Sequence, residues 1–204
     1  TPYQANRLLS VLSKAFNWGE ARGYRADYSN PCRLVERYPE VPRERFLTEH
    51  EFTRLGAALK QALAEGENEF AVAAITLLLF TGARLSEILT LRWSYVDWEN
   101  GFLRLPEAKR GPRQIRLNPL ALKVLKSLKR IEGNEHVICG AKDGAHIVNL
   151  QKPWRRIRAA AGLDGVRIHD LRHSFASEAL ASGSTLPDRK STRLNSSHSS
   201  VSRM

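Results

Sequence analysis

The sequence has little cysteine and no long apolar run, and each shortage excludes a class of protein. Its two cysteines, Cys32 and Cys139, lie far apart and in no metal-ligand spacing. This argues against a disulfide scaffold or a zinc site and favours reduced thiols in the cytoplasm. The longest apolar run, residues 70–80, is far shorter than the roughly 20 residues of a membrane helix. We therefore expect no membrane segment, and a buried helix over residues 70–80.

Acidic residues are outnumbered as well. The chain has 32 Lys and Arg against 21 Asp and Glu, a formal net charge of +11. Basic side chains displace counterions from phosphates, so this excess favours a nucleic acid as partner. A soluble protein that is merely basic is the alternative, because charge alone does not identify a partner. The hydrophobic fraction of 42% is enough for a packed core.

Proline, glycine and charge divide the chain into regions. Residues 3–19 carry apolar side chains at helical spacing, whereas residues 38–45 (YPEVPRER) are charged and proline-bearing, as in a linker between domains. Because the chain starts with Thr1 rather than Met, we expect the beginning of the first domain to be missing. The expected divisions are the end of a helical domain at 1–38, a linker at 39–45 and a larger domain at 46–187.

Helical signals dominate the larger domain. Thr48 with Glu51 is a capping box, Gly82 is a left-handed stop for an apolar helix, and Asn118 with Pro119 is a typical helix start. The expected helices cover residues 48–63, 68–80, 83–91, 118–131, 151–161 and 171–181. Four basic residues lie mostly off the apolar stripe of the fourth helix, and we interpret them first as a solvated face and second as a DNA contact: Lys123, Lys126, Lys129 and Arg130.

The periodicity changes between the third and fourth helices. Residues 95–97, 101–105 and 113–117 alternate as short strands do, with a tight turn at Asn100-Gly101 and an exposed hairpin tip at 109–112. The sequence therefore predicts a mainly α-helical fold with a small antiparallel β-sheet, an α+β protein.

Two groups of polar residues follow helix breaks. Arg84 opens a helix, and Glu87 lies one turn later on the same face; alone, this spacing is more typical of a surface ion pair. His169 and Arg172 lie three apart at a helix start and point the same way, which makes a ready anion site. Alone, a capping histidine and a surface arginine are the simpler interpretation. His169 and His173 have no obvious third ligand for a metal.

Three strings together resemble one family. Residues 81–88 (TGARLSEI) and 169–177 (HDLRHSFAS) are similar to the first and second arginine boxes of tyrosine recombinases of the phage-integrase kind. Residues 108–117 (AKRGPRQIRL) resemble the hairpin that bears the family's catalytic lysine. The strings occur in the family's order and at similar distances. The resemblance implies the tyrosine-recombinase catalytic-domain fold, with residues 1–38 as the end of a DNA-gripping core-binding domain.

The resemblance also implies a role for each matching residue. Arg84 and Arg172 would clamp the scissile phosphate, Glu87 would orient Arg84, and His169 would assist proton transfer at an attacking tyrosine. The reaction would be site-specific DNA recombination or integration through a 3′-phosphotyrosyl link, without a metal or other cofactor. The implied partner is double-stranded DNA, on which the intact protein would form a tetramer, and the implied source is bacterial or phage-encoded.

One further role concerns the leaving group. Lys109 would protonate the departing 5′-oxygen as general acid. The hairpin is one residue shorter than in many members of the family, so Arg110 is the alternative to Lys109.

The sequence has no tyrosine where the family needs its nucleophile. All five tyrosines precede the second box: Tyr3, Tyr24, Tyr28, Tyr38 and Tyr95. Residues 188–204 lose the apolar period, and their possible codons fit a common sequencing adapter, so we expect a translated, disordered adapter there. Removing its four basic residues and one acidic residue (11 − 3) leaves a charge of +8. We therefore expect a truncated and inactive piece of an active recombinase.

Two other hypotheses remain open from the sequence. The chain could be a catalytically silent DNA-binding module that does its work without a tyrosine. From a different class, it could be a helical interaction protein whose charges are solvated faces. Salt-dependent DNA binding separates the last hypothesis from the others.

Overall fold

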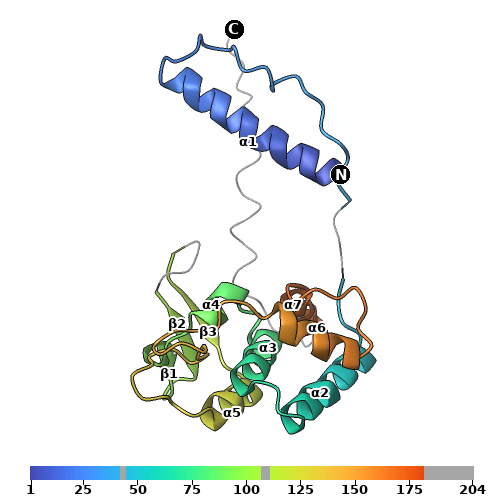
Figure 1. Cartoon of the computed structure of the whole chain (residues 1–204), viewed down its shortest axis with the longest axis vertical. Helices are drawn as coiled ribbons and strands as arrows, with labels where there is room; N and C mark the ends of the chain where they lie inside the picture. The colour runs from blue at the N-terminus through green and yellow to red at the C-terminus, as the bar shows by residue number, and fades with distance from the viewer. Residues whose placement is uncertain (42–44, 107–110, 182–204) are drawn as a thin grey trace. The chain divides into compact units, whose positions relative to one another are not determined.

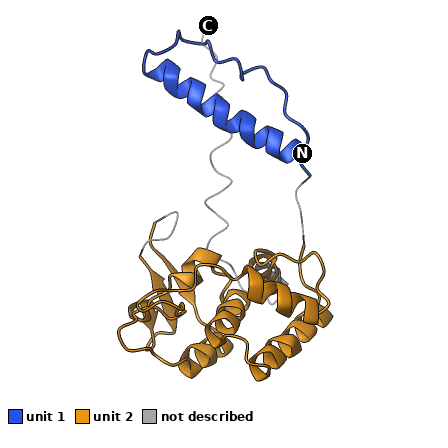
Figure 2. Ribbon diagram, in the orientation of Figure 1, with its two compact units in different colours: residues 1–44 blue, residues 45–204 orange. Residues whose placement is uncertain are grey.

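The computed structural model describes residues 1–41, 45–106 and 111–181, with side chains up to residue 175. The chain forms two compact units, residues 1–44 and residues 45–204 (Figure 2). Predictions about Lys109, Arg110 and residues 188–204 concern positions outside the described residues.

Unit 1 is one long helix with the following chain folded back along it. Helix α1 spans Pro2–Ala21 and begins with a capping box between Thr1 and Gln4, which confirms the helix expected at residues 3–19. The side chain of Asn6 binds the returning chain in both directions. Its Nδ2 donates to the Tyr38 carbonyl (2.8 Å), and its Oδ1 accepts from the Tyr38 N–H (3.0 Å). Residues up to Val41, whose carbonyl accepts from the Tyr3 hydroxyl at 2.7 Å, thus pack on α1.

Unit 2 is organised around one apolar helix. Helix α2 (Glu49–Ala64) begins with the expected capping box of Thr48 and Glu51. Helix α3 (Glu69–Thr81) is buried along nearly its whole length and packs against α2, α4, α5, α6 and α7 (Figure 1). This confirms the buried helix expected for residues 70–80. Because α3 is surrounded, its sequence is apolar on every face instead of on one stripe.

A three-stranded antiparallel sheet lies to one side of these helices, and α6 and α7 lie to the other (Figure 1). Its strands are β1 (Val96–Asp97), β2 (Phe102–Leu105) and β3 (Arg113–Arg116), in the order β1-β2-β3. Leu103 pairs with Ile115, and both side chains are buried. Tyr95 was expected in the first strand but is the last residue of a 3-10 turn, η1 (Trp93–Tyr95). The Tyr95 N–H donates to the Arg92 carbonyl. The expected fold class is confirmed.

The remaining helices differ from expectation at two ends. Helix α4 is Leu85–Leu89, shorter than the predicted 83–91, because Gly82 is left-handed and Arg84 is extended. Helix α5 (Pro119–Ser127) begins at Asn118 as expected. It ends at Leu128, whose extended backbone leaves Ile131 45% exposed, so the apolar stripe predicted to reach Ile131 was wrong. The last two helices agree with expectation: α6 is Gln151–Ala160 and α7 is Asp170–Ala181.

Candidate anion-binding site

The first part of the candidate site is the turn between α3 and α4. Helix α3 ends at Gly82, whose positive φ of 58° turns the chain sharply, and Arg84 is the N-cap residue of α4. Glu87 closes this turn: its Oε2 accepts from the Arg84 backbone N–H (2.7 Å) and its Oε1 from Arg84 Nη1 (2.6 Å). The contact expected between these two residues is therefore present. The Glu87 side chain is only 7% exposed, against 26% for Arg84, so the carboxylate holds the guanidinium from the buried side.

A second guanidinium reaches the same carboxylate. Arg113, at the start of β3, places Nη1 3.6 Å from Glu87 Oε1. One carboxylate cannot neutralise two guanidinium groups, so the region beside Arg84 retains a net positive charge. The Arg113 Nη1 is buried and has no hydrogen-bond partner among the described residues.

The contribution of Arg113 was not predicted from the sequence. A signal was available: Arg113 has the strand alternation of Ile115 and Leu117, both buried, so it lies on the apolar face of β3. A charged side chain on such a face needs a partner. The sequence did not indicate that the partner was Glu87, which lies 26 positions earlier in a different element.

The second part of the site is the start of α7. His169 directly precedes this helix, and Arg172 lies in its first turn. The Arg172 Nη1 donates to the backbone carbonyl of Gly82. The Phe175 ring packs on the same glycine, where a Cβ atom would lie 2.3 Å from Phe175 Cδ1. The structure thus joins the turn that carries Arg84 to the turn that carries Arg172.

His169 has a perturbed imidazole. Partial desolvation lowers its pKa from the ordinary value of 6.5, and the positive charges of His173 and Arg172 lower it further, while Asp170 opposes them. The ring of His173 meets that of His169 edge to face, with centroids 5.0 Å apart. A neutral imidazole beside two arginine-bearing turns can accept a proton from a hydroxyl or bind an anion after protonation. Where Lys109 lies relative to these groups is outside the described residues.

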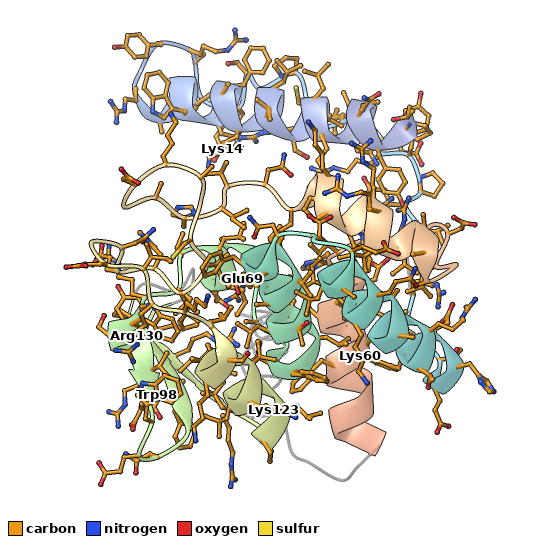
Figure 3. All side chains as sticks on the ribbon, turned by 60° about the horizontal axis from the view of Figure 1, so that its bottom comes forward. Lys14, Lys60, Glu69, Trp98, Lys123 and Arg130 are labelled. Atoms are coloured by element: carbon orange, nitrogen blue, oxygen red, sulfur yellow. The ribbon has the colours of Figure 1, made fainter. Side chains whose placement is uncertain are left out.

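The basic residues of the α5 region are exposed. Lys123, Lys126, Lys129 and Arg130 face solvent; Lys123 and Arg130 are labelled in Figure 3. The guanidinium of Arg130 lies 4.7 Å from the centre of the Trp93 ring. This agrees with the solvated face that the sequence predicted.

The described residues contain neither a metal-ligand cluster nor a membrane-spanning helix. No group of three or more His, Cys, Asp or Glu side chains in them could hold a metal ion. No helix in that part of the chain is long and apolar enough to cross a membrane.

Comparison with known sequences identifies the family. Residues 45–189 match the phage integrase family. The chain belongs to that family. The matching segment contains both arginine-bearing turns and the β2–β3 hairpin.

Individual relatives agree with this assignment. A shufflon-specific DNA recombinase of Escherichia coli is 31% identical over 187 residues, which are 86% of this chain and 43% of the relative. A tyrosine recombinase of Thermosipho africanus is 32% identical over 187 residues, 87% of this chain and 62% of the relative. The chain therefore spans less than two thirds of the length of these relatives.

Solved structures share the fold. A lambda integrase dimer bound to a COC′ core site has a TM-score of 0.65 at 23% identity, covering 90% of this chain and 68% of that one. XerA recombinase has a TM-score of 0.56 at 21% identity, covering 91% and 71%. At these identities the likeness establishes the tyrosine-recombinase fold and nothing finer.

Proposed function

We propose that this chain is the catalytic part of a site-specific DNA recombinase and that its candidate site binds a DNA phosphate. The observation that carries the proposal is the hydrogen bond from Arg172 to the Gly82 carbonyl. It brings the second arginine box onto the turn that presents Arg84. Two fixed guanidinium groups suit the charge that develops on the oxygens of a phosphate under attack.

The reaction we propose is the attack of a tyrosine hydroxyl on that phosphate. The Tyr oxygen bonds to phosphorus, the bond from phosphorus to the 5′-oxygen breaks, and a 3′-phosphotyrosyl link results. His169 takes up the tyrosine proton, and Lys109 gives a proton to the 5′-oxygen. Glu87 acts through Arg84, which it orients. Because the phosphodiester energy is kept in the new link, the reverse attack by another 5′-hydroxyl can rejoin the strands without ATP.

Double-stranded DNA is the partner we propose. The charge excess of the chain and the family assignment support it. The related structures include a lambda integrase tetramer bound to a Holliday junction, and we propose a comparable multimeric assembly on DNA for an intact protein. We further propose that residues 1–38 end a DNA-gripping domain and that residues 39–45 link it to the catalytic domain.

DNA binding is tested by titrating a labelled duplex with the chain at several salt concentrations. Release of counterions predicts that log Kd rises linearly with log salt, at about 0.9 per phosphate neutralised. A flat dependence would contradict the proposal and favour a helical interaction protein.

Strand cleavage is tested with a nicked suicide duplex and a denaturing gel. We propose that this chain cleaves nothing, because no tyrosine follows its second box. A covalent protein–DNA band would contradict this inactivity. A silent DNA-binding module would also show salt-dependent binding without cleavage. A longer chain with a tyrosine after the second box separates this module from a recombinase, because only a recombinase then forms the covalent adduct.

A further inference from the structure

The segment at the start of unit 2 is fixed by an arginine–glutamate pair. Arg45 donates to the carboxylate of Glu51 with both terminal nitrogens, Nη1 to Oε2 at 3.0 Å and Nη2 to Oε1, and Nη1 also donates to the Phe46 carbonyl. Glu51 Oε2 accepts from the Thr48 N–H as well, at 2.9 Å. These bonds, that from Arg45 first, lower the pKa of Glu51 to about 2. Residues 45–48 are thus held in one conformation against the start of α2.

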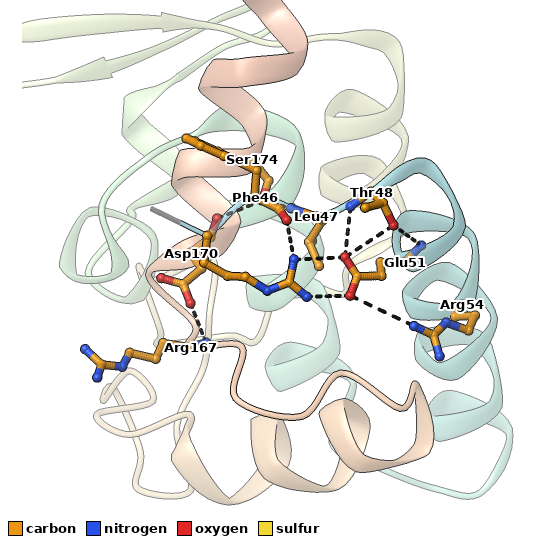
Figure 4. Close-up of polar contacts among 9 residues, drawn as sticks. Phe46, Leu47, Thr48, Glu51, Arg54, Arg167, Asp170 and Ser174 are labelled. Carbon is orange, nitrogen blue, oxygen red and sulfur yellow. Dashed lines mark hydrogen bonds and ion pairs between the residues drawn. The ribbon is translucent and has the colours of Figure 1, made fainter. Parts of the chain in front are cut away.

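The same segment is bonded to α7. The Leu47 N–H donates to Ser174 Oγ at 2.9 Å, and Ser174 Oγ donates to the Asp170 carbonyl at 2.9 Å (Figure 4). Ser174 is 1% exposed and Leu47 8%. The Asp170 carboxylate accepts from the Arg167 N–H at 2.8 Å and attracts the charge of Arg45. The two bonds of Ser174 are buried, so breaking them would leave polar groups without partners inside the protein, and they hold the first turns of α7 in place.

The contact between residues 45–48 and α7 lies on the opposite face of α7 from Arg172. Asp170 and Ser174 are four positions apart and therefore share one face of α7. Arg172 lies two positions from each, about 200° around the helix at 3.6 residues per turn, and so points to the opposite face, where it meets Gly82. A movement of residues 45–48 would rotate or shift the turn that presents His169 and Arg172.

We propose that Arg45, Glu51 and Ser174 are positioning residues, which set the orientation of His169 and Arg172 through the bonds between residues 45–48 and α7. The proposal deepens the proposed function, on which its DNA-binding consequence rests. The geometry of the site in the free protein does not depend on DNA, so the two can be tested separately.

The first test measures the titration of His169 by NMR in the full chain, with its signal assigned by loss in a His169→Ala variant. Ser174→Ala removes the acceptor of the Leu47 N–H. If the first turn of α7 loosens, His169 becomes more hydrated and Arg172 moves away from it. The titration midpoint of His169 then rises toward the ordinary 6.5. Ser127→Ala is the matched control, because Ser127 Oγ also donates within its own helix, to Val124, but is exposed.

A conservative variant guards against misfolding. Arg45→Lys keeps the charge but loses the two-pronged contact with Glu51. Because 29% of the Arg45 side chain is exposed, the ammonium group of the lysine can stay in contact with water, so the variant should fold. We expect its His169 midpoint to lie between those of the unchanged chain and Ser174→Ala. If the midpoint is the same in Ser127→Ala, Arg45→Lys and, where it folds, Ser174→Ala, the positioning role is wrong.

The second test measures the affinity for a short labelled DNA duplex at fixed salt. Ser174→Ala should weaken binding on the order of fivefold, as expected for one lost hydrogen bond, and Ser127→Ala should not change it. Ser174→Ala should also reduce the further loss caused by Arg172→Ala, because Arg172 is already displaced. If Arg172→Ala causes an equal loss in both backgrounds, the positioning role is overturned. If the unchanged chain does not bind DNA at all, the proposed function fails, whereas a shifted His169 midpoint still supports the positioning role.

Discussion

The guanidinium of Arg172 donates a hydrogen bond to the backbone carbonyl of Gly82, a residue 90 positions earlier in the chain. The contact is possible because two properties of glycine coincide at this turn. Gly82 adopts a positive φ of 58°, and its missing side chain leaves room for the Phe175 ring. The turn that presents Arg84 and the helix that carries Arg172 therefore depend on the same residue.

Gly82→Ala should destabilise the protein more than a turn glycine usually does. The left-handed conformation costs about 1–2 kcal/mol for alanine. The new Cβ would also lie 2.3 Å from Phe175 Cδ1, so the Phe175 ring must shift from its place on Gly82. We expect a loss of about 2–4 kcal/mol in the free energy of unfolding, measured by denaturant titration.

Gly101→Ala provides the control for this prediction. Gly101 has a similar φ of 69° but nothing within 4 Å of the added Cβ. Its replacement should therefore show only the conformational part, about 1–2 kcal/mol. Equal losses for the two variants would mean that the packing of Phe175 on Gly82 contributes nothing.

Glu87→Gln should be costly although it changes few atoms. The buried carboxylate serves both Arg84 and Arg113, and an amide would leave two guanidinium groups facing each other without a counter-charge. We expect a destabilisation of about 2–4 kcal/mol. The exposed pair of Arg92 and Glu135, at 2.7 Å, provides a contrast, since Glu135→Gln should change stability by only about 0–1 kcal/mol. Similar values for both would show that Glu87 is not a shared counter-ion.

Acid should weaken the start of unit 2 through Glu51. Its pKa is lowered from 4.5 to about 2 in the folded protein. The folded state therefore binds the proton less readily than the unfolded state, so this contribution is complete above pH 4.5 and is lost as the pH falls toward 2. A Glu51→Gln variant should show a shallower decline in stability over this range in denaturant titrations. An unchanged decline would contradict the pairing with Arg45.

DNA affinity should depend on the protonation of His169. A nearby phosphate stabilises the imidazolium, so DNA raises the pKa of His169 above its lowered value in the free protein. Binding then takes up a proton and strengthens as the pH falls through the interval between the two pKa values. His169→Ala should remove this dependence, whereas His50→Ala, an exposed residue of α2, should retain it. Fluorescence anisotropy at constant salt measures both.

Local signals in the sequence predicted much of the fold and of the site. Capping side chains marked the starts of α2 and α5, glycine marked the end of α3, and strand alternation located the sheet. Arg84 and Glu87 were paired correctly because the two residues lie one helical turn apart.

Other features depend on packing between distant segments, which local patterns do not encode. The hydrogen bond from Leu47 to Ser174 joins residues 127 positions apart, and the ion pair of Arg113 with Glu87 joins the sheet to a helix. The end of α5 at Leu128 was also missed, because apolar spacing continued to Ile131 although the chain had already turned away.

The proposed action of Arg84 and Arg172 on one phosphate is tested most directly by a double-mutant cycle on DNA affinity. Arg84→Ala, Arg172→Ala and the double variant are titrated against a short labelled duplex at fixed salt, with folding checked by circular dichroism. Lys123→Ala, on the exposed face of α5, is combined with each as a control and should be additive. We predict a coupling energy of about 0.5–3 kcal/mol between the two arginines. Additive losses, within about 0.5 kcal/mol, would contradict a shared phosphate.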